Sequence, residues 1–336
     1  MIEVFPGIRW LKLPIAMEHN DLSHVNIYLI EDKNGFTMID TGWNTDTSFS
    51  VLHNALIKSG HNFQSIKQIL ITHIHPDHYG MAGRLRDLSG APILMHQMEK
   101  ELINSRYVNM SELLQKTDTM MINNGVPEEE MVELRNASLD ILNYVVPAVP
   151  DRTLHSGDVI SAGNFKFYVL WTPGHSSGHI CLLEPAKKIL ISGDHILPKI
   201  TPNISIHPQS IDNPLGRYMQ NLEEIRAIDI EMVLPGHDAP FQHLKMRINE
   251  ILGHHRERHQ EILNIIAEKP HTVYDIAHSI RWGSHNGTWQ DLPPFHKRMA
   301  VFETLAHLEM LAADSRVDKM PKKGIIYYRQ RITKAK

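Results

Sequence analysis

The chain of 336 residues has very little cysteine and no long apolar run. Its one cysteine, Cys181, excludes an intramolecular disulfide and any metal site built from several thiolates, so a metal here would need histidine and carboxylate ligands. No stretch approaches the roughly 18 apolar residues of a membrane span, and the N-terminus lacks the basic start and apolar core of a signal peptide. We therefore expect a cytoplasmic protein with no membrane segment.

A strong net charge is also absent. The value of −4 for the whole chain indicates neither a polyanionic nor a polycationic partner. The charge is unevenly distributed, however, because residues 240–336 hold 16 Lys and Arg against 10 Asp and Glu. This asymmetry predicts two units with different surfaces.

Apolar patterns divide the chain into short strands and amphipathic helices. Strand patterns cover residues 9–13, 25–31, 36–40, 66–72, 92–96, 165–172, 179–184, 188–194 and 231–236. Helical patterns lie between them at residues 47–59, 79–88 and 214–228. This alternation predicts an α/β fold in which helices pack on sheets.

Two segments depart from the alternation. Residues 97–146 have helical spacing, and we interpret them as two or three inserted helices. From residue 241 the order is helix, helix, helix and hairpin, which is typical of a winged-helix domain. We therefore predict one domain over residues 1–240, containing the insertion, and a winged-helix-like domain over residues 241–336.

The insertion is rich in methionine. These residues are Met98, Met110, Met120, Met121 and Met131. Methionine side chains suit an adaptable apolar cap over a binding site, although in helices they also serve as ordinary core residues. A cap would favour small or lipophilic substrates over a polymer.

Three histidines and an aspartate lie within six positions of the stretch LITHIHPDHYGMAG, directly after an apolar run. Pro76 disfavours a helix in the residues before it, so we expect an extended chain. In such a chain His73, His75 and Asp77 lie on one side. His78 is then directed elsewhere, so one loop can offer ligands to two neighbouring metal positions. Imidazole and carboxylate ligands without sulfur suit Zn, Fe or Mn.

Three further candidates each follow a strand pattern. They are His175 in TPGHSSGH, Asp194 in ISGDH and His237 in LPGHD. Taken singly, each could be an ordinary polar residue of a surface loop. Because all three follow strands, they can instead meet the histidine loop at one edge of the sheets.

Together, the stretches FTMIDTGW, THIHPDHYG, TPGHSSGH, ISGDH and LPGHD resemble the five successive motifs of the metallo-β-lactamase superfamily. The resemblance covers residues 1 to about 240 and implies an αββα sandwich with its site at the edge of two packed sheets. It also implies seven ligands for two divalent ions. One ion would be held by His73, His75 and His175, the other by Asp77, His78 and His237, with Asp194 bridging both. Asp40 would support the histidine loop without being a ligand.

The implied chemistry is hydrolysis by a hydroxide that bridges the two ions. Two cations lower the pKa of the water between them far below that of bulk water, toward neutrality. Asp77 would orient this nucleophile or relay a proton, and would thus be catalytic. We expect zinc, with iron or manganese as alternatives. Many true β-lactamases of the superfamily have cysteine where this chain has Asp194, so a β-lactam is not the expected substrate.

Several substrate classes stay open. The C-terminal segment resembles the β-lactamase-like protein 2 group, some members of which cleave RNA, and the ligand set is shared with glyoxalase II-like thioesterases. The basic excess of residues 240–336 and the winged-helix order favour RNA. Against RNA, the third helix has only His296, Lys297 and Arg298 as a basic cluster and then carries Glu303 and Glu309, and its apolar positions favour packing or a homodimer. We predict a hydrolase of small-molecule esters, thioesters or lactones. The alternatives are an endoribonuclease and a non-catalytic ligand sensor.

Overall fold

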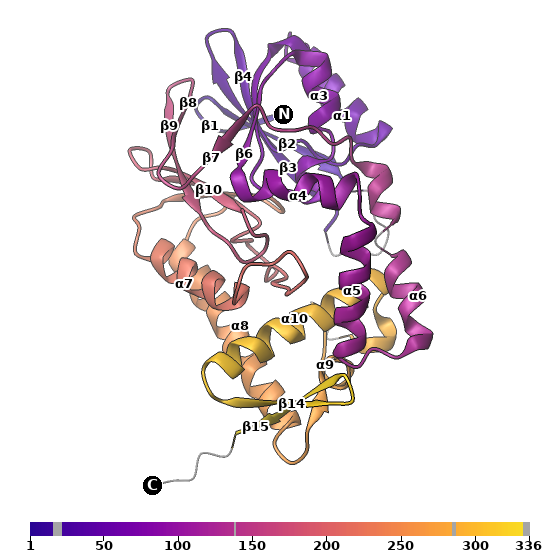
Figure 1. The fold of residues 1–336 in the computed structure, drawn as a ribbon. Coiled ribbons are helices and arrows are strands. Elements are labelled where there is room, and N and C mark those ends of the chain that lie inside the picture. Colours follow the sequence, from indigo (N-terminus) through magenta and orange to yellow (C-terminus); the bar gives the residue numbers. More distant parts are fainter. Residues whose placement is uncertain (16–21, 138, 284–286, 332–336) are drawn as a thin grey trace.

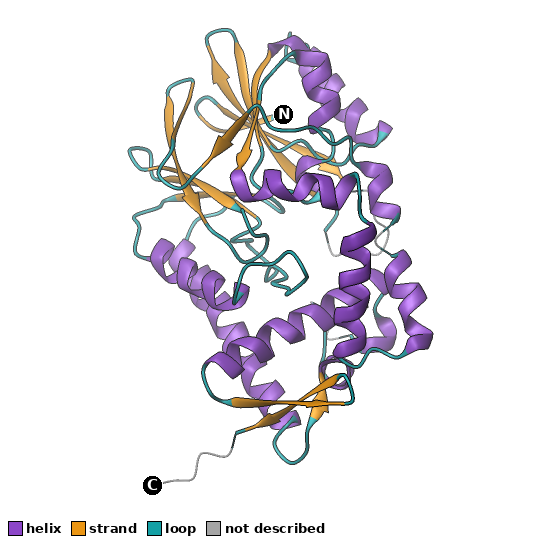
Figure 2. Ribbon diagram, in the orientation of Figure 1, coloured by secondary structure: helices purple, strands orange, loops and turns teal. Residues whose placement is uncertain are grey.

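The computed structural model describes residues 1–15, 22–137, 139–283 and 287–331 (Figure 1). Its strands form two large sheets and a small third sheet (Figure 2). The first sheet has seven strands in sequence order: β1 (Ile2–Phe5), β2 (Ile8–Pro14), β3 (His24–Asp32), β4 (Gly35–Ile39), β5 (Ile66–Leu70), β6 (Ile93–His96) and β7 (Arg152–Leu154). The second has the order β12 (Met232–Pro235), β11 (Ile189–Gly193), β10 (Ile180–Glu184), β9 (Phe165–Trp171) and β8 (Val159–Ala162).

The two large sheets pack face to face, and β3 shows how the layers arise. Successive side chains of a strand point to opposite faces, and both faces of this strand are buried. Val25, Ile27 and Leu29 pack on the helix side of the first sheet. Tyr28 and Ile30 point into the core between the sheets, where they meet apolar residues of the second sheet.

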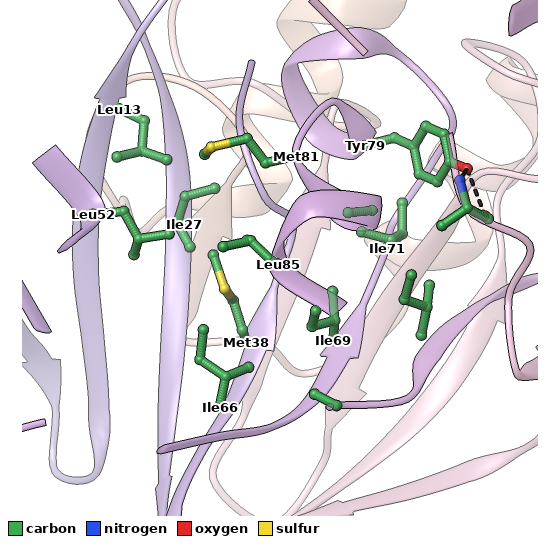
Figure 3. Packing of buried hydrophobic residues seen from close by; sticks show 14 of the residues in the cluster. Leu13, Ile27, Met38, Leu52, Ile66, Ile69, Ile71, Tyr79, Met81 and Leu85 are labelled. Carbon is green, nitrogen blue, oxygen red and sulfur yellow. Dashed lines mark hydrogen bonds between the residues drawn. The ribbon is translucent and has the colours of Figure 1, made fainter. Parts of the chain in front are cut away.

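Helices cover the outer face of each large sheet. The first sheet carries η1 (Phe63–Ser65), α1 (Asp46–Lys58) and α3 (Ala82–Ser89), and the second carries α7 (Pro214–Arg226) and α8 (Leu244–Ile265). Figure 3 shows Leu52 of α1 and Leu85 of α3 against Ile27, Met38 and Ile69 of the first sheet. The predicted α/β sandwich is thus confirmed.

The prediction of one continuous helix over residues 79–88 is wrong, because the chain forms two helices there. The structure has a short α2 (Pro76–Tyr79) and a separate α3 (Ala82–Ser89). The helix is interrupted because the Met81 amide donates to the carbonyl oxygen of Gly42 at 3.0 Å. Gly80 permits this approach, since a Cβ there would lie 2.6 Å from the Tyr144 oxygen and 2.8 Å from that of Gly42.

The insertion is helical, as expected, and consists of α4 (Gln97–Tyr107), α5 (Ser111–Asn123), α6 (Glu128–Asn136) and η2 (Asp140–Tyr144). Helix α4 packs beside the first sheet through Ile103. Helices α5 and α6 extend away from the sheets toward the C-terminal elements (Figure 1). There Met121, Met131 and Leu134 are buried in a core shared with the C-terminal segment. Met121 and Met131 are therefore core residues and do not cap a site.

The C-terminal elements follow the predicted order of helix, helix, helix and hairpin. After α8 come β13 (His271–Thr272), α9 (Val273–Ser279), η3 (Trp289–Asp291), α10 (Pro294–Ala313), β14 (Val317–Lys322) and β15 (Ile325–Gln330). The winged-helix assignment and the boundary at residue 240 stay predictions. Among the described helices, none has the length and apolar character of a membrane span.

The apolar side chains of α10 pack against other residues of the same chain. Val301, Leu305 and Leu308 are buried in the core that α10 shares with α6 and α9. Packing within the chain therefore accounts for these positions, and a homodimer stays a prediction.

The shared core predicts that the insertion stabilises the C-terminal segment. Replacing the fully buried Leu134 with alanine removes apolar contacts and leaves a cavity, so we expect Leu134→Ala to lower the free energy of unfolding by about 2–5 kcal/mol. Val132 lies on the same helix but is 63% exposed. Val132→Ala should therefore change stability by less than about 0.5 kcal/mol. Urea unfolding of both variants measures this, and equal stabilities would contradict the shared core.

Candidate metal centre

The histidine loop begins three residues after β5 and runs into α2. His75 is the last extended residue, with φ −62° and ψ 149°, and Pro76 then occupies the first helical turn. The expectation that His73, His75 and Asp77 lie on one side of an extended chain is therefore wrong. The helical turn moves Asp77 away from the two histidines before it and groups it with His78.

One group of potential ligands consists of His73, His75 and His175. His73 Nε2 lies 3.0 Å from His75 Nδ1, which lies 2.9 Å from His175 Nε2. Ligand atoms about 2.0–2.1 Å from one tetrahedral zinc ion would be about 3.3 Å apart. The three nitrogens are thus already gathered to within a few tenths of an ångström of the spacing that one ion requires.

The second group consists of Asp77, His78, Asp194 and His237. Asp77 Oδ2 lies 3.2 Å from His237 Nε2 and 3.7 Å from His78 Nε2. The two imidazoles are fully buried, whereas the Asp77 side chain keeps 17% of its surface exposed. Asp77 is therefore the carboxylate of this group that is most open to solvent.

Asp194 lies between the two groups. Its Oδ1 is 3.3 Å from His78 Nε2, and its Oδ2 is 3.3 Å from His237 Nε2. The same Oδ2 is 3.5 Å from His175 Nε2 in the first group. One carboxylate can thus contact a cation in either group.

The remaining nitrogens of the imidazoles are held by neighbouring groups. His78 Nδ1 donates to Asp40 Oδ2 at 2.7 Å, and His237 Nδ1 donates to the carbonyl oxygen of His24 at 2.8 Å. His175 Nδ1 donates to the carbonyl oxygen of Asn203 at 2.9 Å. These contacts fix the rings with Nε2 directed at the centre, an arrangement common around bound metals.

Asp40 is the residue that the resemblance placed beneath the loop, and the contacts agree with that role. It adopts φ +59°, in the left-handed region, directly after β4. Its carboxylate accepts from the Thr72 amide at 2.8 Å and from the Thr72 hydroxyl at 2.8 Å. Since it also accepts from His78, one buried carboxylate orients both ends of the loop.

Glu99 is a supporting residue that the sequence did not reveal. It is fully buried in the first turn of α4, where its carboxylate accepts from the amides of Ile74, at 2.8 Å, and of Gly178. Glu99 thus links the loop of His73 to the loop of His175. An acidic residue in the first turn of a helix is so common that nothing in the sequence distinguished this one.

The polar atoms of the second group fit a cation. Within the described part of the chain, His78 Nε2, His237 Nε2 and Asp194 Oδ1 are buried without a hydrogen-bond partner. Burial would lower the pKa of His237, but Asp194 and Asp77 raise it to about 10. Burial likewise opposes charge on His78, yet its three neighbouring carboxylates hold its pKa well above the usual value. The carboxylates of this group therefore stabilise positive charge, and bound divalent ions would supply such a charge.

In the first group the histidine pKa values are lowered instead of raised. Burial, together with the neighbouring imidazoles, holds the pKa of His73 and that of His75 well below the usual value. The pKa of His175 is lowered as well, chiefly by burial. These three rings are therefore neutral at pH 7, which is the form that binds a metal ion.

Both groups open into a cavity of about 1180 Å³. Its walls come from the sandwich, from the insertion through α4 and α5, from the loop after β11, and from α8 and α10. Met110 is the member of the predicted methionine cap that lines the cavity. The floor is thus polar, and the surrounding walls include apolar side chains from distant parts of the sequence.

A partly buried carboxylate on α10 supports the position of His175. Glu303 accepts a hydrogen bond from the Asn203 amide, and the Asn203 carbonyl oxygen in turn accepts from His175. Burial raises the pKa of Glu303 to about 7, although Arg258 and Asn203 oppose the rise. The connection from α10 to the metal centre therefore contains a titratable group.

This shift makes stability depend on pH. Because the pKa of Glu303 is raised on folding, protonated Glu303 contributes to the free energy of unfolding at low pH. This contribution is lost as pH rises through about 7. The free energy of unfolding of the unsubstituted chain should therefore fall relative to that of Glu303→Gln as pH rises. From pH 5 to pH 8 we expect the difference between the two proteins to change by about 2 kcal/mol in favour of the variant. Urea unfolding at both values measures the gain. Glu133→Gln, at an exposed position, should show no such change, and a pH-independent effect of Glu303→Gln would contradict the assignment.

Comparisons with known proteins agree with this arrangement. The family model of the metallo-beta-lactamase superfamily matches residues 20–237. A probable metallo-hydrolase of Bacillus subtilis, YqjP, is 22% identical over 317 residues, which are 91% of this chain and 93% of the relative. Acyl-coenzyme A thioesterase MBLAC2 of Bos taurus is 26% identical over 242 residues, 70% of this chain and 79% of the relative.

Solved structures resemble the whole chain. A metallo-beta-lactamase family protein from Thermus thermophilus has a TM-score of 0.83 and 26% identity, covering 98% of this chain and 100% of that one. A beta-lactamase domain protein from Burkholderia ambifaria has a TM-score of 0.83 and 27% identity, covering 98% and 94%. The similarity thus includes the insertion and the C-terminal segment. The chain belongs to the metallo-beta-lactamase superfamily of metal-dependent hydrolases.

Proposed function

We propose that this hydrolase cleaves a small-molecule ester, thioester or lactone with two divalent ions, which we expect to be zinc. The observation that carries the proposal is the position of Asp194, whose Oδ2 lies within 3.5 Å of a nitrogen from each ligand group. The first ion would be held by His73, His75 and His175. The second would be held by Asp77, His78 and His237, with Asp194 shared. When bound, the ions would polarise the scissile carbonyl and lower the pKa of a water molecule.

The residues of the chain would perform the proton chemistry. Asp77 lines the cavity, and its carboxylate is more exposed than that of Asp194, so it can accept a proton from a water molecule that attacks the substrate. It can then pass that proton to the departing oxygen or sulfur, which leaves as the alcohol or thiol. Hydrolysis adds one water across the acyl bond and yields an acid and an alcohol or thiol. No serine or cysteine nucleophile is required.

The cavity supports a small substrate. Its volume of about 1180 Å³ is slightly above the roughly 300–1000 Å³ of typical small-molecule sites. Leu113, Leu142 and Phe302 are among the apolar side chains of its wall. Such a wall suits an aliphatic acyl group, and the relative named as an acyl-coenzyme A thioesterase supports the same class.

The basic cluster of α10 also favours a small molecule over RNA. His296 and Arg298 line the cavity, whereas Lys297 lies over the Trp289 ring at 5.9 Å. A helix that reads nucleic acid has to present its basic residues on an accessible outer surface. Two of the three basic residues line the cavity instead, so this cluster does not support RNA binding.

The two-ion site predicts a metal stoichiometry. Purified protein loaded with Zn²⁺ should contain two equivalents per chain by elemental analysis. Asp194→Ala removes the carboxylate that lies near nitrogens of both ligand groups, so we expect fewer than two equivalents. Asp87→Ala changes an exposed carboxylate on α3 and should retain two. A single equivalent in the unsubstituted protein would overturn the two-ion proposal.

The proposed role of Asp77 predicts a loss of turnover. At equal metal content, Asp77→Asn should lower kcat for a p-nitrophenyl ester or an acyl thioester by about 100-fold or more, because the amide cannot accept the proton. Asp87→Ala again provides the control. A screen of esters, thioesters, lactones and RNA on the loaded protein tests the substrate class. Cleavage of RNA alone would replace the small-molecule proposal with the endoribonuclease.

A further inference from the structure

One lysine and four arginines line the cavity, and one of these, Arg281, is exposed to solvent. Lys199 is paired with Asp238, Nζ to Oδ1 at 3.1 Å, and Arg258 is paired with Glu261, Nη1 to Oε2 at 2.7 Å. Arg106 and Arg298 line the same cavity, and in the described ranges of the chain neither forms an ion pair with a carboxylate, although the charge of Arg106 acts on the buried Glu99. The reaction proposed above uses neither of these two guanidinium groups.

Arg106 is held in place by neutral partners. It projects from the last turn of α4, where its Nε donates to Gln209 Oε1 at 2.9 Å and its Nη2 donates to His207 Nε2 at 2.9 Å. Both partners belong to the loop after β11. They orient the guanidinium without compensating its charge, and no described residue accepts a hydrogen bond from Nη1.

Arg298 comes from the opposite wall of the cavity, on α10. Its guanidinium carbon lies 5.4 Å from the centre of the Phe295 ring. Burial, together with the charge of Arg106, lowers its pKa to about 10. The pKa of His207 is also held well below its usual value by burial and by both arginines. Arg106, His207 and Arg298 are therefore close enough to repel one another.

A partly buried cation without a counter-ion costs stability, because its lost hydration is not replaced. Two guanidinium groups directed into one cavity are compensated when an oxyanion binds between them. Planar guanidinium forms two parallel hydrogen bonds to a carboxylate or a phosphate. The arrangement thus has the chemistry of an anion site completed by its ligand.

The loop after β11 places this site beside the metal centre. Asn203 of the loop accepts a hydrogen bond from His175, and His207 and Gln209 of the same loop accept from Arg106. The Ser177 hydroxyl, two residues beyond His175, donates to the Gln209 carbonyl oxygen at 2.8 Å. The anion site and the first ligand group are therefore supported by one segment.

We propose that Arg106 and Arg298 bind a carboxylate or phosphate group of the substrate, away from the bond that is cleaved. The substrate is then an ester or thioester with an anionic group on its acyl or leaving part. This inference rests on the proposed hydrolysis at the neighbouring metal groups. The subsite is assembled from the insertion and the C-terminal segment, which together supply both arginines.

The test compares matched substrates. One series contains p-nitrophenyl monoesters of dicarboxylic acids of increasing chain length, and the other contains p-nitrophenyl alkanoates in which a methyl group replaces the free carboxylate. Zinc-loaded protein should show a higher kcat/KM for the dicarboxylate series at one or more lengths. The preference is the ratio of kcat/KM for a dicarboxylate monoester to kcat/KM for the matched alkanoate. Arg298→Gln should lower this ratio at least about tenfold, as expected for lost charge-assisted hydrogen bonds. Arg298→Lys keeps the charge but not the planar fork, and should fall between the two.

Arg217→Gln is the matched control, because Arg217 lies on the exposed face of α7 outside the cavity. It should leave the ratio unchanged. The thermal midpoint of Arg298→Gln should equal or exceed that of the unsubstituted protein, since the change removes an uncompensated cation. A lower midpoint combined with an unchanged ratio would make Arg298 a structural residue and overturn the proposal.

A binding measurement separates this proposal from the proposed function. Glutarate and inorganic phosphate are titrated calorimetrically into zinc-loaded protein and into Arg298→Gln. At least about tenfold weaker binding of either probe to the variant supports the subsite even if no ester is hydrolysed, a result that would refute the proposed function alone. Equal binding of both probes to the two proteins, or no binding to either, overturns the subsite.

Discussion

The concentration of negative charge at one edge of the sandwich is the constraint on which the site depends. Asp40, Asp77 and Asp194 gather around His78, whose ring lies 2.7 Å from Asp40 and 3.3 Å from Asp194. Carboxylates buried this closely require compensating positive charge. Raised histidine pKa values meet this need when no metal is bound, and divalent ions meet it in the loaded enzyme. The supporting contacts serve to keep these ligands together.

Those contacts come from parts of the chain that are far apart in sequence. Glu99 of the insertion bonds to the loop of His73 and to the loop of His175, and Glu303 of α10 reaches His175 through Asn203. The insertion and α10 also share a hydrophobic core. The cavity therefore has walls whose positions depend on one another, so a packing change in the shared core can reach the metal centre.

The local predictions succeeded where short-range chemistry determines the structure. The strands around the motifs and the helices of the insertion lie close to the predicted residues, because apolar periodicity and helix starts are local signals. Asp77 was misplaced for a local reason as well, since the extended chain expected before Pro76 was continued through Asp77, although proline is well tolerated in a first helical turn. The break at Gly80 was missed because it depends on Gly42 and Tyr144, which are distant in sequence.

The sequence by itself determined the types and order of the seven candidate ligands, the family and the reaction class. These follow from residue chemistry and from motifs at the ends of strands, and both can be read along the chain. Only the structure decided that a helical turn carries Asp77 toward His78, that two methionines of the insertion are core residues, and that Glu99 links two loops. It also brought Arg106 and Arg298 to one cavity. Such pairings depend on how distant elements pack, and no local pattern encodes them.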